Sequence, residues 1–299
     1  MNSSLISIVT PTRNRCDVLL RSVQTVLAQT ITDFEHIIVD DASSDGTKET
    51  IEALADPRLR YIRFPEQRGA NAARNAGIEY SRSPIITFLD SDDAFLPKRL
   101  EHTLSHFRSR HNLSLMISSF ILHGARGGAS TVNGDVFLSP SALESALIIE
   151  AFSLGTSAIT ARRKVMLEAG SFDPKIRRFQ DRDLLLRLSR REGAFVSAKI
   201  DWVKYPSRDS ISRQRPGYVQ SYGDLALAHR EVIQRYPDVA PFLVGRRILN
   251  NTLQGRPLQA LSDYRENQAH PALGYSGMHL VRTYINGRRL RARIRNEFH

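Results

Sequence analysis

The chain contains a single cysteine, Cys16, among its 299 residues. One thiol cannot form an intrachain disulfide or a cysteine-based zinc site, and this predicts a reducing, cytoplasmic compartment. No apolar run approaches the roughly 18–20 residues that a membrane-spanning helix needs. The first fifteen residues lack the basic start and the longer apolar core of a secretory signal peptide, because they run directly into a strand-like segment. These absences predict a cytoplasmic globular protein.

Several nucleotide and metal motifs are also missing. No G-x-x-x-x-G-K-[ST] loop or H-E-x-x-H pair occurs, and the glycine-rich segment 123–129 is expected to be a turn because it does not match G-x-G-x-x-G. What the chain has in excess is positive charge, since 42 Lys and Arg against 31 Asp and Glu give a formal net charge of +11. This charge predicts an anionic partner, which composition alone leaves open between a nucleotide, a nucleic acid and an anionic membrane surface.

Strand-like and helix-like segments alternate over the first hundred residues. The apolar patterns predict strands at 5–10, 34–41, 59–65 and 84–90, and helices at 16–30, 48–55, 70–81 and 97–110. Such alternation is typical of a parallel α/β sheet with helices on both faces. In these sheets ligands bind beyond the carboxyl ends of the strands.

The remainder of the chain falls into two parts. The middle predicts strands at 112–124 and 157–163 and helices at 141–152 and 180–193. From about Pro216 onward every pattern is helical, and no strand alternates with these helices. This change predicts an α/β domain over residues 1–213 and a basic, helical C-terminal extension over residues 214–299.

Three carboxylates follow the fourth expected strand, at Asp90, Asp92 and Asp93. Two unit charges about 4 Å apart repel by roughly 4 kcal/mol at an effective dielectric constant of 20, and a divalent cation removes that cost. Mg²⁺ in proteins takes one or two carboxylates together with substrate phosphates. The position beyond a strand favours a metal–diphosphate site at Asp90 and Asp92, and the alternative is a polar loop that caps the next helix.

A second acidic pair, Asp40 and Asp41, ends the second expected strand. An acidic side chain at this position can accept a hydrogen bond from a ribose hydroxyl or a base N–H. The following residues, with Asp45 as the candidate cap, are expected to form an Asx-turn and start the next helix. Both acidic turns belong to the same sheet edge, and we therefore expect Asp40 and Asp41 to contact a ligand.

Two further segments leave alternatives open. Asp181 stands just before an amphipathic helix, where the helix dipole stabilises a carboxylate by about 0.3–1 kcal/mol. A structural carboxylate and a general base both fit this position, because both use the ionised form. The segment 287–295 holds five arginines with Leu290 and Ile294 among them. It is consistent with a solvated helix face, an anionic membrane surface or RNA.

Taken together, six segments resemble one family. They are "SIVTPTRNR", "IIVDDASSDGT", "NAARNAGI", "PIITFLDSDD", "GSFD" and "QDRDLLLRL", and they occur in the order and spacing of inverting family 2 glycosyltransferases of the GT-A fold. The resemblance covers residues 5–212 and leaves the last 85 or so residues outside it. It implies an α/β nucleotide-diphospho-sugar transferase fold, with a mostly parallel central sheet flanked by helices and followed by the helical extension.

The resemblance also implies a nucleotide site. Thr10 and Asp41 occupy positions that contact the base, commonly uracil, and Asp40 lies beside them. Arg68 is a weaker candidate for a base or phosphate contact. Asp90 opens the D-x-D pattern and faces the ribose or the metal.

The same resemblance implies the metal and the base. Asp92 is the position that coordinates Mg²⁺ or Mn²⁺, and Asp181 matches the catalytic base, with Gln180 where a Glu usually stands. The loop that closes over the donor phosphates departs from the family pattern. It has Ser207 near the expected His, and possible substitutes are Lys204, Arg208 and Arg213.

The implied activity is metal-dependent, inverting transfer of a sugar from a nucleotide donor, expected to be a UDP-sugar, to a hydroxyl of a glycan or lipid-linked acceptor in cell-surface polysaccharide synthesis. Lipid-linked acceptors sit in membranes, so residues 281–298 are expected to dock on the inner face of an anionic membrane. One alternative is a non-catalytic scaffold on the same fold. Another is a nucleotidyltransferase, which would need a glycine-rich loop after the first strand. Nucleic acid is not an expected partner.

Overall fold

The structure is a computed structural model that describes residues 4–124, 130–131, 133–206 and 217–297. Packing divides the chain into two units. Unit 1 comprises residues 1–143, 153–174 and 187–207, and unit 2 comprises residues 144–152, 175–186 and 208–299. The sequence predicts one boundary at residue 213, whereas two short inner segments group with the C-terminal helices in this division.

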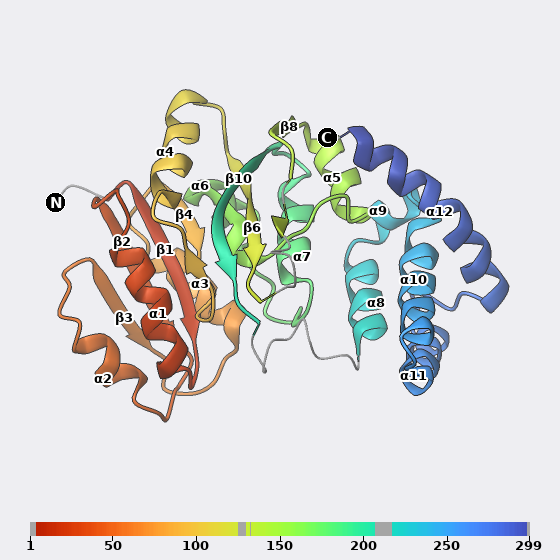
Figure 1. Ribbon diagram of the computed structural model, residues 1–299, viewed down its shortest axis with the longest axis horizontal. Helices are drawn as coiled ribbons and strands as arrows, with labels where there is room; N and C mark the ends of the chain where they lie inside the picture. The colour runs from red at the N-terminus through yellow and green to blue at the C-terminus, as the bar shows by residue number, and fades with distance from the viewer. Residues whose placement is uncertain (1–3, 125–129, 132, 207–216, 298–299) are drawn as a thin grey trace. The chain divides into compact units, whose positions relative to one another are not determined.

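Unit 1 is built on the predicted parallel sheet. Its first strands are β1 (Ile6–Thr12), β2 (Phe34–Asp40), β3 (Leu59–Arg63) and β4 (Ile85–Phe88). They pair in parallel in the order β3-β2-β1-β4, which confirms the expected parallel arrangement for this half of the sheet (Figure 1). The connecting helices are α1 (Cys16–Leu27), α2 (Thr47–Glu52) and α3 (Ala70–Tyr80), and α4 (Arg99–Ser109) follows the fourth strand.

Beyond β4 the sheet is mixed rather than mostly parallel. The strand β9 (Ile159–Arg162) lies antiparallel between β4 and β6 (Leu115–Leu122). The long strand β10 (Ala194–Lys204) runs parallel to β6 and antiparallel to β5 (Ala94–Phe95). Short strands β7 (Ser130–Thr131) and β8 (Val136–Leu138) pair with β6 and β10. The short helices η1 (Thr156–Ala158) and α6 (Arg163–Glu168) flank β9.

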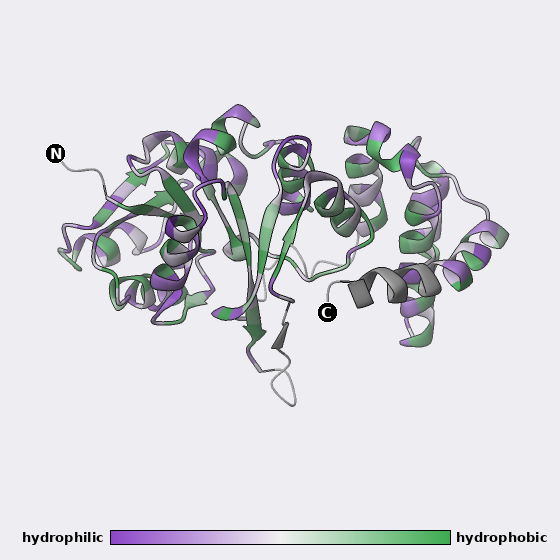
Figure 2. Ribbon diagram, turned by 90° about the horizontal axis from the view of Figure 1, so that it is seen from above, coloured by the Kyte–Doolittle hydropathy of each residue, from purple (hydrophilic) through white to green (hydrophobic). Residues whose placement is uncertain are grey.

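The core of unit 1 lies on both faces of the sheet. Every residue of β1 and β2 is buried, and Figure 2 shows the strands and helices of this part with hydrophobic and hydrophilic residues intermixed. Successive β2 side chains point to opposite faces, so Ile38 packs with α1 and α2 while Ile37 and Val39 pack with Ala73 of α3. This alternation confirms helices on both faces of the sheet.

Unit 2 contains the predicted C-terminal helices. They are α8 (Tyr218–Ala228), α9 (Arg230–Arg235), α10 (Val239–Leu253), α11 (Pro257–Ala269) and α12 (Gly277–Glu297). The helical pattern over residues 218–236 is divided at His229 into α8 and α9. The unit also includes the end of α5 (Pro140–Ile148) and most of α7 (Gln180–Leu188). Among the described residues, no helix has the length and apolarity needed to cross a bilayer.

Candidate active site

The carboxyl edge of β1, β2 and β4 collects most of the predicted site residues. In the parallel register Thr12 of β1 faces Asp40 of β2, and Val9 of β1 faces Phe88 of β4. Backbone hydrogen bonds to β1 continue for one residue beyond β2 and β4. The Asp41 amide donates to the Thr12 carbonyl at 2.9 Å, and the Leu89 amide donates to the Val9 carbonyl at 3.1 Å. The two acidic turns therefore lie at one edge of the sheet.

Asp40 is fully buried, and its carboxylate is engaged on both oxygens. One oxygen accepts from the Ser43 amide at 2.9 Å and from the Ser43 hydroxyl, and the other accepts from the Tyr61 hydroxyl. These bonds hold the turn that follows β2, in which Ala42 has a φ of +60°. In this structure the Asp40 carboxylate shapes the turn beside the predicted nucleotide site.

Asp41 fixes the loop that enters α3. Its two oxygens accept from the amides of Arg68 at 2.6 Å and Gly69 at 2.9 Å. Gly69 has a φ of +93°, a conformation that favours glycine. The Arg68 guanidinium lies over the Phe64 ring, 4.8 Å from its centroid. Asp41 and Arg68, both predicted to contact the nucleotide, are thus joined through this loop.

Thr10 is also buried, and its hydroxyl is 2.9 Å from Nε2 of His36 on β2. Burial lowers the pKa of His36 to about 3, so the imidazole is neutral at physiological pH. The Thr10 hydroxyl is therefore directed at a neighbouring strand. A base contact by Thr10 remains a prediction.

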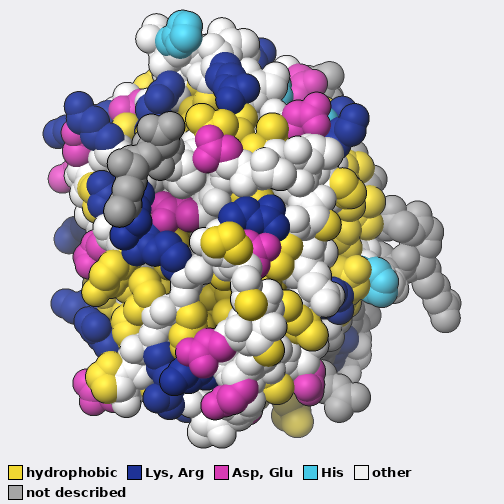
Figure 3. All heavy atoms as spheres, turned by 90° about the vertical axis from the view of Figure 1, so that its left-hand side faces the viewer, with side chains coloured by type: hydrophobic (Ala, Val, Ile, Leu, Met, Phe, Trp, Pro, Cys, Tyr) yellow, Lys and Arg dark blue, Asp and Glu magenta, His cyan; other side chains and the backbone are white. Residues whose placement is uncertain are grey.

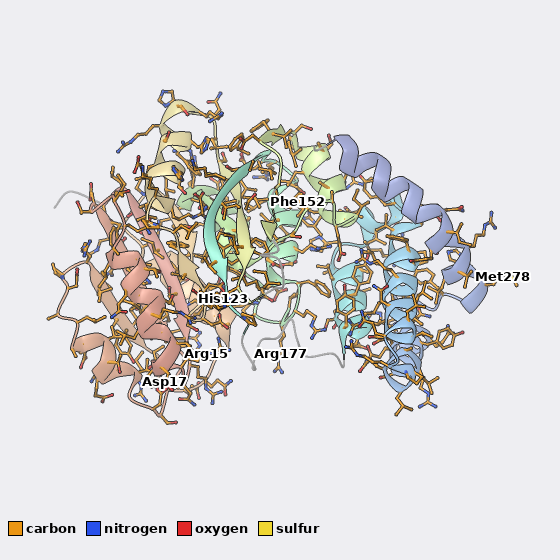
Figure 4. The ribbon with its side chains drawn as sticks, in the orientation of Figure 1. Arg15, Asp17, His123, Phe152, Arg177 and Met278 are labelled. Carbon is orange, nitrogen blue, oxygen red and sulfur yellow. The ribbon has the colours of Figure 1, made fainter. Side chains whose placement is uncertain are left out.

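The acidic turn after β4 is held by three arginines. Arg74 of α3 donates to Asp90 at 2.7 Å, and Arg15 donates to Asp92 at 3.1 Å. Arg21 of α1 donates to the Asp92 carbonyl at 2.6 Å. Figure 4 labels Arg15 where the chain leaves β1 and enters α1. Burial raises the pKa of Asp90, but the charges of Arg74, Lys204 and Arg15 outweigh it and hold this pKa below its usual range.

The third carboxylate of the turn, Asp93, faces inward. It is buried, and it accepts from the Ser157 hydroxyl at 2.7 Å and the Tyr205 amide at 3.2 Å. Burial, together with the negative charge of Asp90, raises the pKa of Asp93 to about 8. Asp93 therefore joins the turn to the chain that follows β10.

Aromatic and basic side chains surround the end of β10. The Tyr205 ring stacks on His123, which follows β6, with centroids 4.4 Å apart (Figure 4 labels His123). The Arg21 guanidinium lies 3.8 Å from the Tyr205 centroid. The charge of Lys204 acts on both Asp90 and Asp93. Lys204 is thus placed beside the acidic turn. The other two candidates for the closing loop, Arg208 and Arg213, lie outside the described residues, as does Ser207.

Sequence reasoning missed the polar face of α3. Arg74 binds Asp90 and lies over the Phe172 ring, 5.4 Å from its centroid, while Asn71 donates to the Asp173 carbonyl at 2.8 Å. Asn75 exchanges two hydrogen bonds with the Phe172 backbone, at 2.8 and 2.9 Å. The spacing 71, 74, 75 places all three side chains on one helix face. That pattern in an alanine-rich helix was the available signal, and it explains why "NAARN" and "GSFD" occur together.

Asp181, the predicted base, belongs to unit 2. It is the second residue of α7, and its Oδ1 accepts from the following Arg182 amide at 2.8 Å. Gln180 is the first residue of the same helix.

The chemistry of the acidic turn fits a divalent cation. Asp90 and Asp92 each use one carboxylate oxygen for an arginine, and the second oxygen of each makes no hydrogen bond to a described residue. No group of three or more His, Cys, Asp or Glu within the described part of the chain is arranged to enclose a metal. Two carboxylates suffice for Mg²⁺ when substrate phosphates supply the other ligands.

Comparison with known proteins places these residues in a family. Residues 7–124, which include both acidic turns, match the family described as Glycosyl transferase family 2. A glycosyltransferase of Haemophilus influenzae is 30% identical over 203 residues, covering 66% of each chain. The Escherichia coli UDP-Glc:alpha-D-GlcNAc-diphosphoundecaprenol beta-1,3-glucosyltransferase WfgD is 32% identical over 120 residues, 40% of this chain and 47% of the relative. The chain spans about half the length of WfgD and less of several other curated relatives.

Solved structures show the same fold at low identity. Staphylococcus aureus TarS 1-349, solved in complex with UDP-GlcNAc, superposes with a TM-score of 0.66 at 15% identity over 98% of this chain and 92% of TarS 1-349. The mannosyltransferase PcManGT from Pyrobaculum calidifontis, in complex with GDP-Man and Mn²⁺, gives a TM-score of 0.63 at 14% identity over 100% of this chain and 84% of that one. The chain belongs to glycosyl transferase family 2 and has a GT-A fold.

Proposed function

We propose that this protein transfers a sugar from a nucleoside-diphosphate donor, a UDP-sugar, to a hydroxyl of a glycan or lipid-linked acceptor in polysaccharide synthesis. The observation that carries the proposal is the acidic turn at Asp90–Asp92, each carboxylate of which keeps one oxygen available at the edge that also bears Asp41. The names of relatives support the donor and the pathway class, because WfgD uses UDP-Glc and TarS has been solved with UDP.

The donor binds at the carboxyl edge of the sheet in unit 1. The loop held by Asp41 presents Arg68 toward the nucleotide, and Thr10 and Asp40 support the strands beneath it. Asp90 and Asp92 would hold Mn²⁺ or Mg²⁺, and the cation would supply neutralising charge for the leaving diphosphate. Lys204 adds a fixed positive charge beside the same turn.

Asp181 then acts as the general base. It accepts the proton of the acceptor hydroxyl as that oxygen attacks the anomeric carbon on the face opposite the departing diphosphate. A single displacement inverts the configuration and forms no covalent enzyme intermediate. General-base catalysis contributes typically 10²–10⁴-fold, so Asp181→Asn is expected to reduce transfer by about that factor.

The test combines binding and turnover. UDP affinity is measured by calorimetry with Mn²⁺ and with EDTA, for the wild type, Asp92→Asn and the control Asp33→Asn, which changes an exposed residue at the opposite end of β2. A panel of nucleotide sugars is then screened for transfer with Asp181→Asn and its unit 2 control, the exposed Asp238→Asn. Equal UDP affinity in EDTA would refute the metal assignment, and normal transfer by Asp181→Asn would move the base elsewhere. UDP binding without transfer to any acceptor would favour a non-catalytic scaffold.

We also propose that unit 2 attaches to an anionic lipid surface. On α12, the apolar side chains of Met278, Val281 and Ile285 are 84%, 62% and 58% exposed, and their spacing places them on one face (Figure 4 labels Met278). Arg282 is exposed beside them, and residues 214–299 contain thirteen arginines against six acidic residues. Unit 1 differs in this respect, because on its β3 side basic and acidic side chains are mixed (Figure 3). The side chains of the arginines from Arg288 onward lie outside the described residues.

Vesicle sedimentation tests this attachment. The full chain is expected to bind anionic vesicles at low salt and to release at high salt, because each basic residue contributes about 1 kcal/mol near such a surface. A Val281→Ser, Ile285→Ser variant should bind more weakly, since apolar side chains bury shallowly in the interface. Equal binding to neutral vesicles would refute the proposal. Concentration-dependent dimerisation lost in the variant would assign the stripe to a second copy of the chain.

A further inference from the structure

The two residues that follow Asp181 on α7 are linked to the C-terminal helices, Arg182 through Glu150 and Asp183 directly. Arg182 donates to Glu150 at 3.1 Å and to the Leu147 carbonyl at 3.0 Å. The other Glu150 oxygen pairs with Arg246 of α10. All three charged side chains are at most 20% exposed. Glu150 therefore ties the first turn of α7 to α10.

Asp183 makes the second anchor. Its Oδ1 is 2.9 Å from Nε2 of His229, and both side chains are almost completely buried. His229 is the residue at which the helical chain breaks between α8 and α9. With Asp183 ionised, Nε2 of His229 is the donor. The break at His229 and the start of α7 are thus fixed to each other.

The residue that leads into α7 is held from the same side. Phe179 has a φ of +62°, an unfavourable conformation for a bulky residue that only its surroundings can maintain. Its ring lies edge-on to Tyr218 and Tyr222 of α8, with centroid distances of 5.2 and 6.1 Å. The Phe179 carbonyl accepts from the Asp183 amide at 2.8 Å. The backbone on both sides of Asp181 is therefore set by contacts to helices α8 and α10.

Asp181 itself has little to hold it. Its carboxylate accepts one hydrogen bond, from the next amide of its own helix, and no other described residue binds it. The position of its oxygens therefore depends on the backbone of the first turn of α7. A catalytic group displaced by about 1 Å can lose 10²-fold in rate.

We infer that the C-terminal helices position the general base. In this inference, which rests on the proposed function, His229 and Arg246 act through Asp183, Glu150 and Arg182 to place Asp181. Both act on Asp181 through other residues, so both are positioning residues. They support turnover and leave nucleotide binding in unit 1 unchanged.

The test uses the full chain and a matched control. His229→Leu removes the donor to Asp183, and His229→Gln keeps an amide donor near the place of Nε2. Asn251→Leu breaks a different buried pair of unit 2, the 2.6 Å bond from Asn251 to Asp263, which does not involve α7. Arg246→Met and Arg246→Lys form an independent arm in case His229→Leu does not fold. For each variant we would measure kcat, KM for the donor, UDP affinity and thermal unfolding.

We expect kcat to fall at least tenfold in His229→Leu and Arg246→Met, with UDP affinity within twofold of the wild type. His229→Gln and Arg246→Lys should recover most of kcat, and Asn251→Leu should keep it despite lower stability. Equal loss of kcat in Asn251→Leu would mean that only general stability is involved, and an unchanged kcat in both His229→Leu and Arg246→Met would overturn the inference. Asp181→Asn is assayed alongside, because normal transfer by that variant would instead refute the proposed base.

Discussion

Arg74 is a single residue that serves three neighbours. It pairs with Asp90 at 2.7 Å, donates to Asn71 at 3.1 Å and covers the Phe172 ring. Its charge is the strongest influence that lowers the pKa of Asp90. Arg74 thereby keeps a partly buried carboxylate ionised, which is the form that binds a cation.

Replacing Arg74 should weaken nucleotide binding. We expect Arg74→Gln to raise the Kd for UDP with Mn²⁺ by about tenfold, equivalent to about 1.4 kcal/mol, because Asp90 loses its counter-charge and its fixed orientation. The control is Arg60→Gln, which breaks the 2.6 Å pair with Glu35 at the amino-terminal end of β2. Calorimetry should find UDP affinity unchanged in that control. The same loss in both variants would show that the effect is not local to the site.

The stability of the fold depends on pH through His36. Its pKa is about 3 in the folded protein because burial disfavours the charged ring, and about 6.5 when unfolded. Below pH 6.5 the unfolded chain binds a proton that the folded chain does not, so stability falls as the pH falls toward 3. At pH 5 the loss is about 2 kcal/mol. Urea unfolding between pH 7 and 5 should show this loss in the wild type and a shallower dependence in His36→Gln; parallel curves would contradict it.

Single residues of the site were predicted by position better than by contact. The ends of strands can be recognised in the sequence. From them we correctly predicted that Asp40, Asp41, Asp90 and Asp92 lie at one edge of the sheet. The hydrogen-bond partners of these carboxylates could not be predicted from the sequence, because Tyr61 and Arg74 lie on other elements that only the folded chain brings close to them. Asp40 and Thr10 are therefore more enclosed than a ligand-contacting role suggests.

At the scale of elements, α3 lies unusually close to β1. A Cβ added at Gly77 would stand 2.3 Å from Cγ1 of Val9, so the helix can approach the strand only because residue 77 is glycine. We expect Gly77→Ala to lower the free energy of unfolding by about 1–3 kcal/mol, the usual cost of overpacking. Gly46→Ala is the control, because a Cβ there meets nothing within 4 Å.

Urea denaturation measures the free energy of unfolding of both glycine variants. Because the clash is with a side chain, the double variant Gly77→Ala, Val9→Ala should be less destabilised than the two single changes add up to. Strict additivity would mean that the contact between α3 and β1 is not the cause.

The sequence did not predict strand β10 or the break between α8 and α9, and the reason is local in each case. The pairing of β10 with β6 shifts register between Ser197, Ile200 and Trp202, which interrupts the alternation by which a strand is recognised. The helical pattern at 218–236 continues through His229, whose backbone break depends on packing that the local sequence does not reveal. The first four strands were predictable because each is short, contains aliphatic or aromatic residues and is followed by a helical pattern.

At the scale of the whole molecule, the two units interleave along the chain. Residues 144–152 and 175–186 lie in sequence within the α/β part but pack with the C-terminal helices. No composition change marks these segments, which is why a single boundary at residue 213 was predicted. A boundary at residue 213 would separate Glu150 from its ion-pair partner Arg246 and Asp183 from its hydrogen-bond partner His229.

A chain ending at residue 213 should therefore fold poorly. It would leave Asp183 and Glu150 without their C-terminal partners, and breaking a buried pair by removing one partner costs about 3–5 kcal/mol. We expect residues 1–213 to unfold at a markedly lower temperature than the full chain, or to bind a hydrophobic dye at low temperature because apolar surface is exposed. Calorimetric scans of both proteins decide this, and equal transition temperatures would show residues 1–213 to be an autonomous domain.

The late position of β10 also has a consequence during synthesis. This strand pairs with β6 along residues 195–204, yet its last residue, Lys204, lies about eighty residues beyond the end of β6 at Leu122. At roughly 5–20 residues per second the ribosome needs about 4–16 s to supply it. Throughout that interval one edge of the apolar strand β6 has no partner from its own chain, and unpaired edges recruit strands from other molecules. This protein is therefore exposed to aggregation on the ribosome until residue 204 has emerged.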